Sequence, residues 1–165
     1  MNKLILINGF ARSGKDTFAY FIKDIIKNIN IVSSIDPVKD CLSRLISEYE
    51  LSDKNDKLRT FLSEVKDSWI KFNNGPFKYI SSIYENSDQH LISFIREINE
   101  IKKLKNKYNN CITLFIQRNE TSEPLDLKNK WKLEESDFKY DYYINNNSTL
   151  DNLKNECIKF CEIIK

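Results

Sequence analysis

Apolar residues along the chain form short continuous runs, separated by longer segments in which they recur every three or four positions. A continuous apolar run is typical of a strand that is covered on both faces of a parallel sheet. The runs predict strands at Leu4–Asn8, 31–34, 91–95, 111–116 and 140–145.

The segments between these runs have the spacing of amphipathic helices. Two of them carry start signals: Asp36-Pro37 is an N-cap followed by proline at the first helical position, and 148–151 has a capping-box pattern. The helix at 54–72 has an apolar stripe made of Leu58, Phe61, Leu62, Val65, Trp69 and Phe72. The predicted helices are 16–29, 36–49, 54–72, a short one ending near 84, 98–108 and one that begins at 148.

The alternation of strands and helices predicts an α/β fold with a five-stranded parallel sheet and right-handed crossovers. A length of 165 residues fits one domain, 1–165, with a sizeable core. Two segments do not fit the minimal alternation. One is a helical stretch at 35–85, and the other is a polar stretch at 119–139.

The segment directly after the first strand carries the clearest chemical signal. Gly9-Phe10-Ala11-Arg12-Ser13-Gly14-Lys15-Asp16-Thr17 matches the Walker A phosphate loop, with Asp-Thr where Ser or Thr usually follows the lysine. The glycines let backbone N–H groups turn toward phosphate oxygens, and the following helix adds its positive N-terminal end. We expect Lys15 to reach the β- and γ-phosphates of ATP, and Asp16 or Thr17 to lie where Mg²⁺ or its water is held.

Composition and charge narrow the function classes. The formal net charge is +2, from 26 basic and 24 acidic residues, which gives little support to nucleic-acid binding. No apolar run is long enough for a membrane span, and the start of the chain does not have the pattern of a signal peptide, so we expect a cytoplasmic protein.

Cysteine and histidine do not indicate a metal centre. The four cysteines lie in apolar patterns without CxxC pairs and are interpreted as buried free thiols (Cys41, Cys111, Cys157, Cys161). His90 lies in a polar stretch, where a surface position is the expectation.

Four segments together resemble the deoxynucleoside monophosphate kinase-like branch of P-loop kinases. This branch includes bacteriophage deoxynucleotide kinases and animal-type phosphomevalonate kinases. The phosphate loop is the specific match. Residues 34–40 resemble the branch's second-strand exit, 91–100 its strand ending in D-[VI]-R-x-x-N-E, and 141–150 its final strand and last helix cap.

The resemblance implies γ-phosphoryl transfer from ATP with Mg²⁺ to an acceptor phosphate. It also implies that 35–85 binds the acceptor and that 119–139 is a lid. Arg96 would clamp phosphate at the carboxyl edge of the sheet, and Asn146 would lie near the nucleotide base. One position departs from the pattern. Phe94 stands where the branch has aspartate, and Asp36 or Asp16 is the candidate to replace that carboxylate.

Arginine is scarce, with five among the 26 basic residues, so each arginine is a candidate phosphate ligand. Arg59 and Lys66 lie on one side of the helix at 54–72 and are candidates for the acceptor site. Lys39 is a weaker candidate, and Arg44 is expected at the surface. For Arg118, a place over ATP and a surface place remain equally open. The Trp69 side chain is expected to pack in the core.

The leading hypothesis is therefore a kinase for a (deoxy)nucleoside monophosphate, acting with ATP and Mg²⁺. A kinase for another small phosphate ester is the alternative within the same class. A nucleotide-binding switch with little transfer activity is the alternative from another class, because Phe94 replaces the carboxylate. The sequence indicates neither a membrane nor a nucleic-acid partner and leaves the oligomeric state open.

Overall fold

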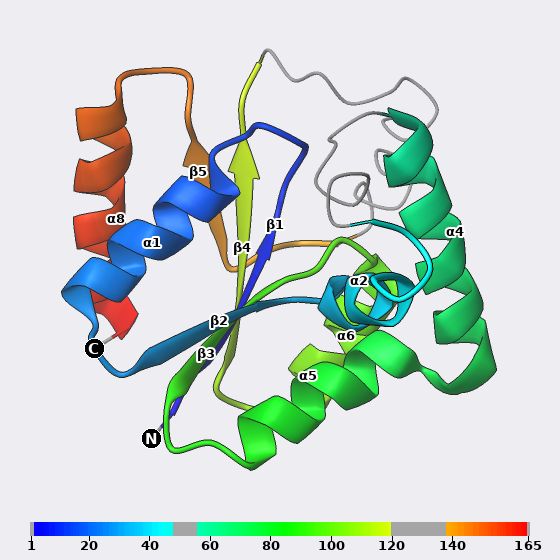
Figure 1. The fold of residues 1–165 in the computed structure, drawn as a ribbon. Helices are drawn as coiled ribbons and strands as arrows, with labels where there is room; N and C mark the ends of the chain where they lie inside the picture. The colour runs from blue at the N-terminus through cyan, green and yellow to red at the C-terminus, as the bar shows by residue number, and fades with distance from the viewer. Residues whose placement is uncertain (1, 48–55, 120–137, 165) are drawn as a thin grey trace.

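A computed structural model describes residues 2–47, 56–119 and 138–164. Its sheet is parallel throughout, with strand order β2-β3-β1-β4-β5 (Figure 1). The strands are β1 (Leu4–Asn8), β2 (Ile29–Ser33), β3 (His90–Phe94), β4 (Cys111–Gln117) and β5 (Tyr142–Asn145). The predicted α/β class and five-stranded parallel sheet are confirmed.

The helices divide between the two faces of the sheet. Alternate side chains of β1 point to opposite faces, so Ile5 and Ile7 pack with α1 and α8, whereas Leu4 and Leu6 pack with α5 and α6. The helices are α1 (Lys15–Ile25), α2 (Asp36–Leu42), α4 (Asp56–Asn73), α5 (Gly75–Glu85), α6 (Ile98–Lys107) and α8 (Leu150–Ile164).

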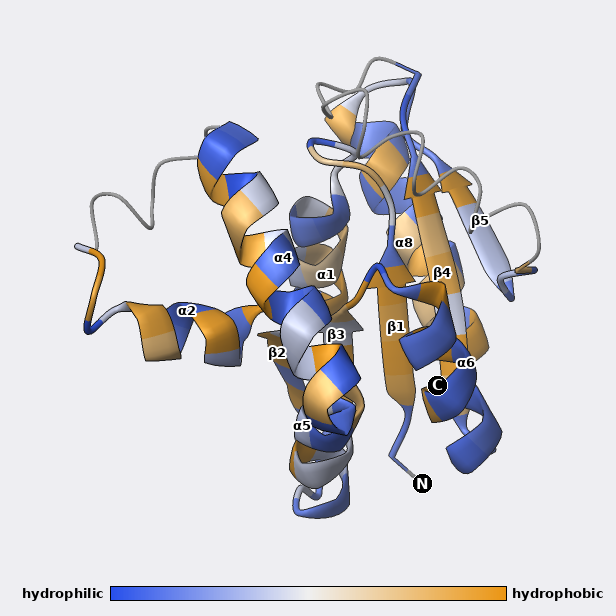
Figure 2. Cartoon of the chain, turned by 90° about the vertical axis from the view of Figure 1, so that its right-hand side faces the viewer, coloured by the Kyte–Doolittle hydropathy of each residue, from blue (hydrophilic) through white to orange (hydrophobic). Residues whose placement is uncertain are grey.

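A third, smaller apolar cluster joins α2 to α4. Val38, Leu42 and Leu62 are its buried members, and Trp69 packs against it as expected. Figure 2 shows α2 and α4 on the β2 side of the sheet, away from β5. This part of the fold is therefore a local unit attached to the β2–β3 edge.

Several predicted boundaries and burials are wrong. The helix predicted at 16–29 ends at Ile25, because Ile26 is extended and Ile29 already pairs with β3. The helix predicted at 36–49 ends at Leu42, and Leu45 is 82% exposed. On α4, Phe61 and Phe72 are exposed, because the small cluster covers a narrower stripe than the sequence predicts.

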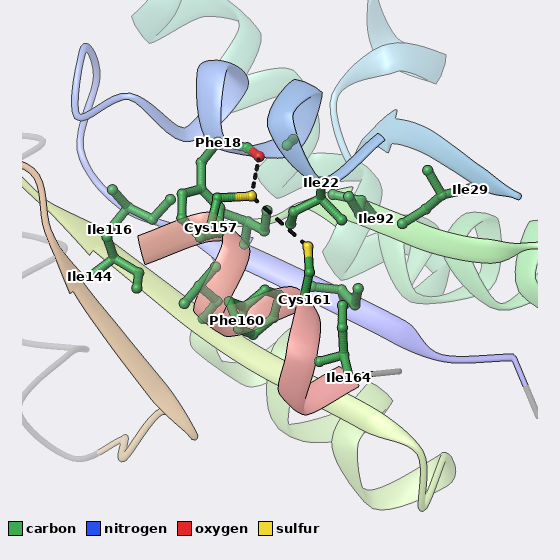
Figure 3. Packing of buried hydrophobic residues seen from close by; sticks show 14 of the residues in the cluster. Phe18, Ile22, Ile29, Ile92, Ile116, Ile144, Cys157, Phe160, Cys161 and Ile164 are labelled. Atoms are coloured by element: carbon green, nitrogen blue, oxygen red, sulfur yellow. Dashed lines mark hydrogen bonds between the residues drawn. The ribbon is translucent and has the colours of Figure 1, made fainter. Parts of the chain in front are cut away.

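The cysteines are buried as expected at three of the four positions. Cys157 and Cys161 lie on one side of α8, with their sulfur atoms 4.0 Å apart, and Cys157 donates to the Phe18 carbonyl oxygen at 3.8 Å (Figure 3). The hydrogen bond with Cys161, together with burial, raises the pKa of the Cys157 thiol, which keeps it protonated. Cys41 is exposed, so the expectation of burial was wrong there, because α2 turns this position away from its cluster.

His90 is half-buried at the start of β3 and not simply at the surface. Its Nδ1 accepts a hydrogen bond from the backbone N–H of Lys3 at 3.0 Å. Burial, with the positive N-terminus and Lys3 nearby, lowers the pKa of the imidazole. Among the described helices, none has the length and apolar character required to cross a membrane.

Candidate active site

The loop between β1 and α1 contains two glycines with positive φ angles. Gly9 has φ +145°, and a Cβ there would collide with the Ile116 carbonyl oxygen of β4. Gly14 has φ +94° and caps α1, and a Cβ there would collide with the side-chain amide of Asn146. Both positions therefore require glycine for conformation and for space.

Asn8 is a residue at this site that the sequence analysis missed. Its Oδ1 accepts the Gly9 N–H at 2.7 Å, while its Nδ2 donates to the Tyr140 hydroxyl at 2.6 Å and to the Arg96 carbonyl oxygen at 3.2 Å. One buried amide thus joins the start of the loop to the segments after β3 and before β5. The signal in the sequence was a polar residue that ends an apolar strand directly before the first glycine.

Lys15 lies at the start of α1 and is buried, with 9% of its surface exposed. Its Nζ donates to the Phe10 carbonyl oxygen at 2.5 Å, so the ammonium lies across the loop. The N-terminus of a helix attracts anions through its unpaired N–H groups and its dipole. Loop, lysine and helix end therefore bring backbone N–H groups and a positive charge together, an arrangement that favours an anion.

A cleft of about 970 Å³ extends from this loop across the carboxyl edge of the sheet. Of the residues predicted for the site, Gly9 and Ser13 are not among its lining residues. The predicted residues that line it are Ala11, Arg12, Gly14, Lys15, Asp16, Thr17, Asp36, Lys39, Arg59, Lys66, Arg96, Arg118 and Asn146. Parallel strands bring their carboxyl ends to one edge, which explains how residues so far apart in sequence meet.

Asn146, directly after β5, is hydrogen-bonded to the phosphate loop. Its Nδ2 donates to the Ser13 carbonyl oxygen at 2.9 Å, and its own N–H donates to the Gln117 carbonyl oxygen at 2.8 Å. This contact to the loop is one that the sequence did not predict. The expected position near a nucleotide base stays a prediction.

The side of the cleft formed by β2, α2 and α4 is rich in charged groups that already have partners. Asp36 Oδ2 accepts the Ser33 N–H at 2.6 Å, so this carboxylate is tied to the end of β2. Arg59 lies 3.4 Å from Asp56 on the same helix. Lys66, which was predicted as an acceptor ligand, is buried and lies 2.5 Å from Glu97.

The pKa of Tyr79, on α5, is affected by the carboxylates of α2. Burial, together with the negative charges of Asp36 and Asp40, raises the pKa of its hydroxyl. The phenol therefore stays protonated near neutral pH. It is not among the residues that line the cleft.

Phe94 ends β3 between Ile7 of β1 and Ser33 of β2, and it lines the cleft. Its ring is half-buried against the α1–α8 core, so no carboxylate comes from this strand position. Within the described ranges, no group of three or more His, Cys, Asp or Glu side chains could hold a metal ion. Mg²⁺ needs fewer protein ligands, because it keeps waters and binds substrate phosphates. Asp16 and Thr17 supply oxygen atoms of the right kind for it.

Glu100, the last residue of the segment 91–100, contacts two neighbouring helical residues. Glu100 is fully buried, accepts the Phe77 N–H at 3.1 Å near the start of α5, and pairs with Lys103 at 2.5 Å. A carboxylate at a helix N-terminus is favourable. Glu100 therefore fastens α6 to α5, which keeps both helices on one face of the sheet.

The residues predicted for the lid lie mostly outside the described part of the chain. Arg118, the residue after β4, is exposed at the cleft. Residues 120–137, with Trp131, are not described.

No protein-family model matches the sequence, and a search of curated proteins finds no match either. Solved structures match over nearly the full length of both chains. Shikimate kinase from Aquifex aeolicus has a TM-score of 0.58 at 18% identity and covers 97% of this chain and 96% of its own. Thymidylate kinase from Candida albicans has a TM-score of 0.56 at 16% identity, with 98% and 92% covered.

Dephospho-CoA kinase from Campylobacter jejuni has a TM-score of 0.54 at 12% identity, with 99% and 98% covered. At these identities the likeness establishes the fold and leaves the substrate open. The chain has the P-loop kinase fold.

Proposed function

We propose that this protein transfers the γ-phosphoryl group of ATP to a small phosphorylated acceptor of the (deoxy)nucleoside monophosphate class. The observation that carries the proposal is the joining of two sites in one cleft. The phosphate loop with Lys15 and three further basic side chains, Arg59, Lys39 and Arg96, line the same cleft. Solved kinases with the same fold act on small molecules, as their names state: shikimate, thymidylate and dephospho-CoA.

The donor side would act through binding and charge. Backbone N–H groups of the loop after Gly9 and the Lys15 ammonium would hold the β- and γ-phosphates, in place of the Phe10 carbonyl contact seen here. Asp16 and Thr17 would hold Mg²⁺, which supplies charge neutralisation on the phosphates when it is bound. Arg118 would cover the triphosphate from the end of β4.

The acceptor side would orient a second phosphate. Guanidinium groups bind phosphate with two parallel hydrogen bonds, which suits Arg59 and Arg96. Phosphoryl transfer needs placement in line and positive charge around the moving group, more than covalent help from the protein. A cleft that holds both phosphates between fixed cations supports this chemistry.

Phe94 favours a second candidate, a nucleotide-binding module with little transfer activity. A carboxylate at this position would organise the metal or the acceptor, and an aromatic ring does neither. In this case ATP would bind at the loop and act as a signal.

The two candidates separate in one experiment. The protein is mixed with Mg-ATP and with a panel of ribo- and deoxynucleoside monophosphates plus phosphomevalonate, and ADP formation is measured. Formation of ADP that depends on one acceptor supports the kinase. ATP binding without acceptor-dependent ADP supports the module, and the absence of ATP binding contradicts both.

A further inference from the structure

Lys66 and Glu97 form a buried ion pair in the wall of the cleft. Lys66 comes from α4 and Glu97 from the residue before α6, and their charged atoms lie 2.5 Å apart. Their side chains are 7% and 14% exposed. Removing two charges from water is costly, and a buried pair is weak support for stability in itself. A buried pair in a substrate cleft therefore suggests a role in binding.

The ammonium of Lys66 is directed by its partners. It has three N–H donors, and the described contacts use one toward Glu97 Oε1 and a longer one, 3.4 Å, toward the Ser34 hydroxyl. Lys66 lines the cleft together with Ser34 and Arg96. Since Glu97 and Ser34 take two of the three N–H groups of the Lys66 ammonium, one N–H group is left to donate into the cleft.

Glu97 also balances the charge of this wall. Its Oε2 is buried and has no hydrogen-bond partner among the described residues. Its negative charge offsets that of Lys66, so the pair adds no net charge beside Arg59 and Arg96. Glu97 directly follows Arg96, so its tie to α4 also fixes the backbone that carries this arginine.

We propose that Glu97 is a positioning residue for the acceptor. It holds the Lys66 ammonium in place and neutralises it, so that the acceptor phosphate binds the two arginines and Lys66 donates one directed hydrogen bond to a neighbouring oxygen. This inference rests on the proposed function, because it concerns the acceptor side of the same cleft. It changes the expected role of Lys66 from phosphate ligand to hydrogen-bond donor.

The test measures KM and kcat for the nucleoside monophosphate that the panel selects. Glu97→Gln leaves Lys66 charged, so this variant should bind the anion more tightly, with KM lower by about threefold or more. Because the ammonium is then displaced toward the phosphate, kcat should fall about tenfold. Lys66→Met leaves Glu97 as an uncompensated negative charge, so KM should rise by about threefold or more.

The double variant Lys66→Met/Glu97→Gln removes both charges. Its KM should return to within about twofold of the wild-type value, while kcat stays about tenfold lower, because the directed donor is lost. Glu64→Gln is the matched control, since this carboxylate is exposed on α4 and does not line the cleft. If a single variant fails to fold, the double variant still decides the question through its kcat.

Opposite shifts of KM in the two single variants support the inference. Unchanged KM in both, shifts in the same direction, or a double variant with wild-type kcat would overturn it and make the pair an anchor between α4 and the end of β3. If the wild type transfers no phosphate, the same comparison uses dissociation constants for dTMP and AMP in the presence of a non-hydrolysable ATP analogue. If the dissociation constants of the variants shift as expected for KM, the inference is supported and only the proposed transfer reaction is contradicted. The absence of monophosphate binding, with ATP binding intact, contradicts the inference.

Discussion

The two ends of the cleft are built in different ways. At the phosphate-loop end, the neighbouring strands and the residue after β5 hold the loop: Gly9 lies against the backbone carbonyl of Ile116, and the Asn146 side chain donates to the carbonyl of Ser13. At the other end, side chains of α2 and α4 make a small cluster of their own, joined to the sheet by the Lys66–Glu97 pair.

This difference has a consequence for function. Under the proposed function the loop binds a triphosphate, whose shape does not depend on the acceptor, so a firmly held loop suits it. Acceptors differ, and a wall built from side chains on a separate cluster can change without disturbing the sheet. We therefore expect substitutions at the loop end to affect folding or ATP binding, and substitutions at the acceptor end to affect the acceptor.

The largest effect on stability is expected for Gly9→Ala. The new Cβ would meet the backbone carbonyl of Ile116, which cannot move aside, and a φ of +145° strains any L residue. Strain and overpacking together should lower the free energy of unfolding by about 2–6 kcal/mol. Urea denaturation measures it, and a loss below about 1 kcal/mol would contradict the rigid backbone contact.

The next effect concerns transfer and belongs to the acceptor end. Arg96→Ala should lower turnover about a hundredfold or more, which is about 2.7 kcal/mol of transition-state stabilisation. The ATP affinity should hardly change. Arg44→Ala, an exposed arginine after α2, is the matched control. Turnover within a factor of about three of wild type would make Arg96 structural.

Lys15→Ala should act on the donor end alone. A ligand at a hundredfold excess over its Kd stabilises the folded protein by about 2.7 kcal/mol, and this variant should lose that ATP-dependent gain. The unliganded protein should melt near the wild-type temperature. Lys23→Ala, exposed on the same helix, should keep the full gain. Equal responses to ATP in the two variants would contradict the phosphate-loop assignment.

Gly75→Ala tests whether the side chains of the α2–α4 cluster can move to accommodate a substitution. A Cβ at Gly75 would collide with the Trp69 ring, a side chain that can move in part. We expect a loss of about 1–3 kcal/mol, smaller than for Gly9→Ala, with an unchanged response to ATP. When Gly75→Ala is added to a Trp131→Phe background, the fluorescence emission of Trp69 should shift relative to that background, because the ring has moved. A loss as large as that of Gly9→Ala would remove the distinction between the two ends.

The smallest effect is expected for the protonation of His90, which begins β3 at the edge of the sheet opposite the cleft. Loss of its contribution should lower the stability of the whole fold, and therefore of both ends of the cleft equally. Burial lowers the pKa of His90 in the folded state, so its neutral form stabilises the fold above the unfolded value of about 6.5. That stability should be lost as the pH falls through the lower folded pKa, when Nδ1 can no longer accept from Lys3. His90→Asn should flatten the decline between about pH 7 and pH 5 in urea denaturation. An equally steep decline in this variant would assign the pH dependence to other groups.

The phosphate loop and the α/β class could be predicted from sequence because their signals are local. A glycine-rich turn between an apolar run and a helical pattern specifies its own backbone, as Gly9 and Gly14 show with their positive φ angles. The strand β1 was predicted at its observed bounds for the same reason, since a buried parallel strand reads as a continuous apolar run.

The errors arose where burial depends on what lies opposite. Cys41 and Leu45 have the spacing of a buried stripe, but α2 turns Cys41 away from its cluster, and Leu45 lies beyond the end of the helix at Leu42. Phe72 completes an apolar stripe on α4 and is 83% exposed, because no described element covers this side chain. Periodicity reports which residues share a face and not whether that face is covered.

The sequence by itself thus determined where the candidate phosphate loop lies, because the residues of its motif are consecutive. Only the tertiary structure decided the strand order and the contacts among distant residues. Asn8 meets Tyr140, Asn146 meets Ser13, and Lys66 meets Glu97. These pairs are set by the crossover connections of the sheet, which bring strand ends together across the chain, and no local pattern encodes them.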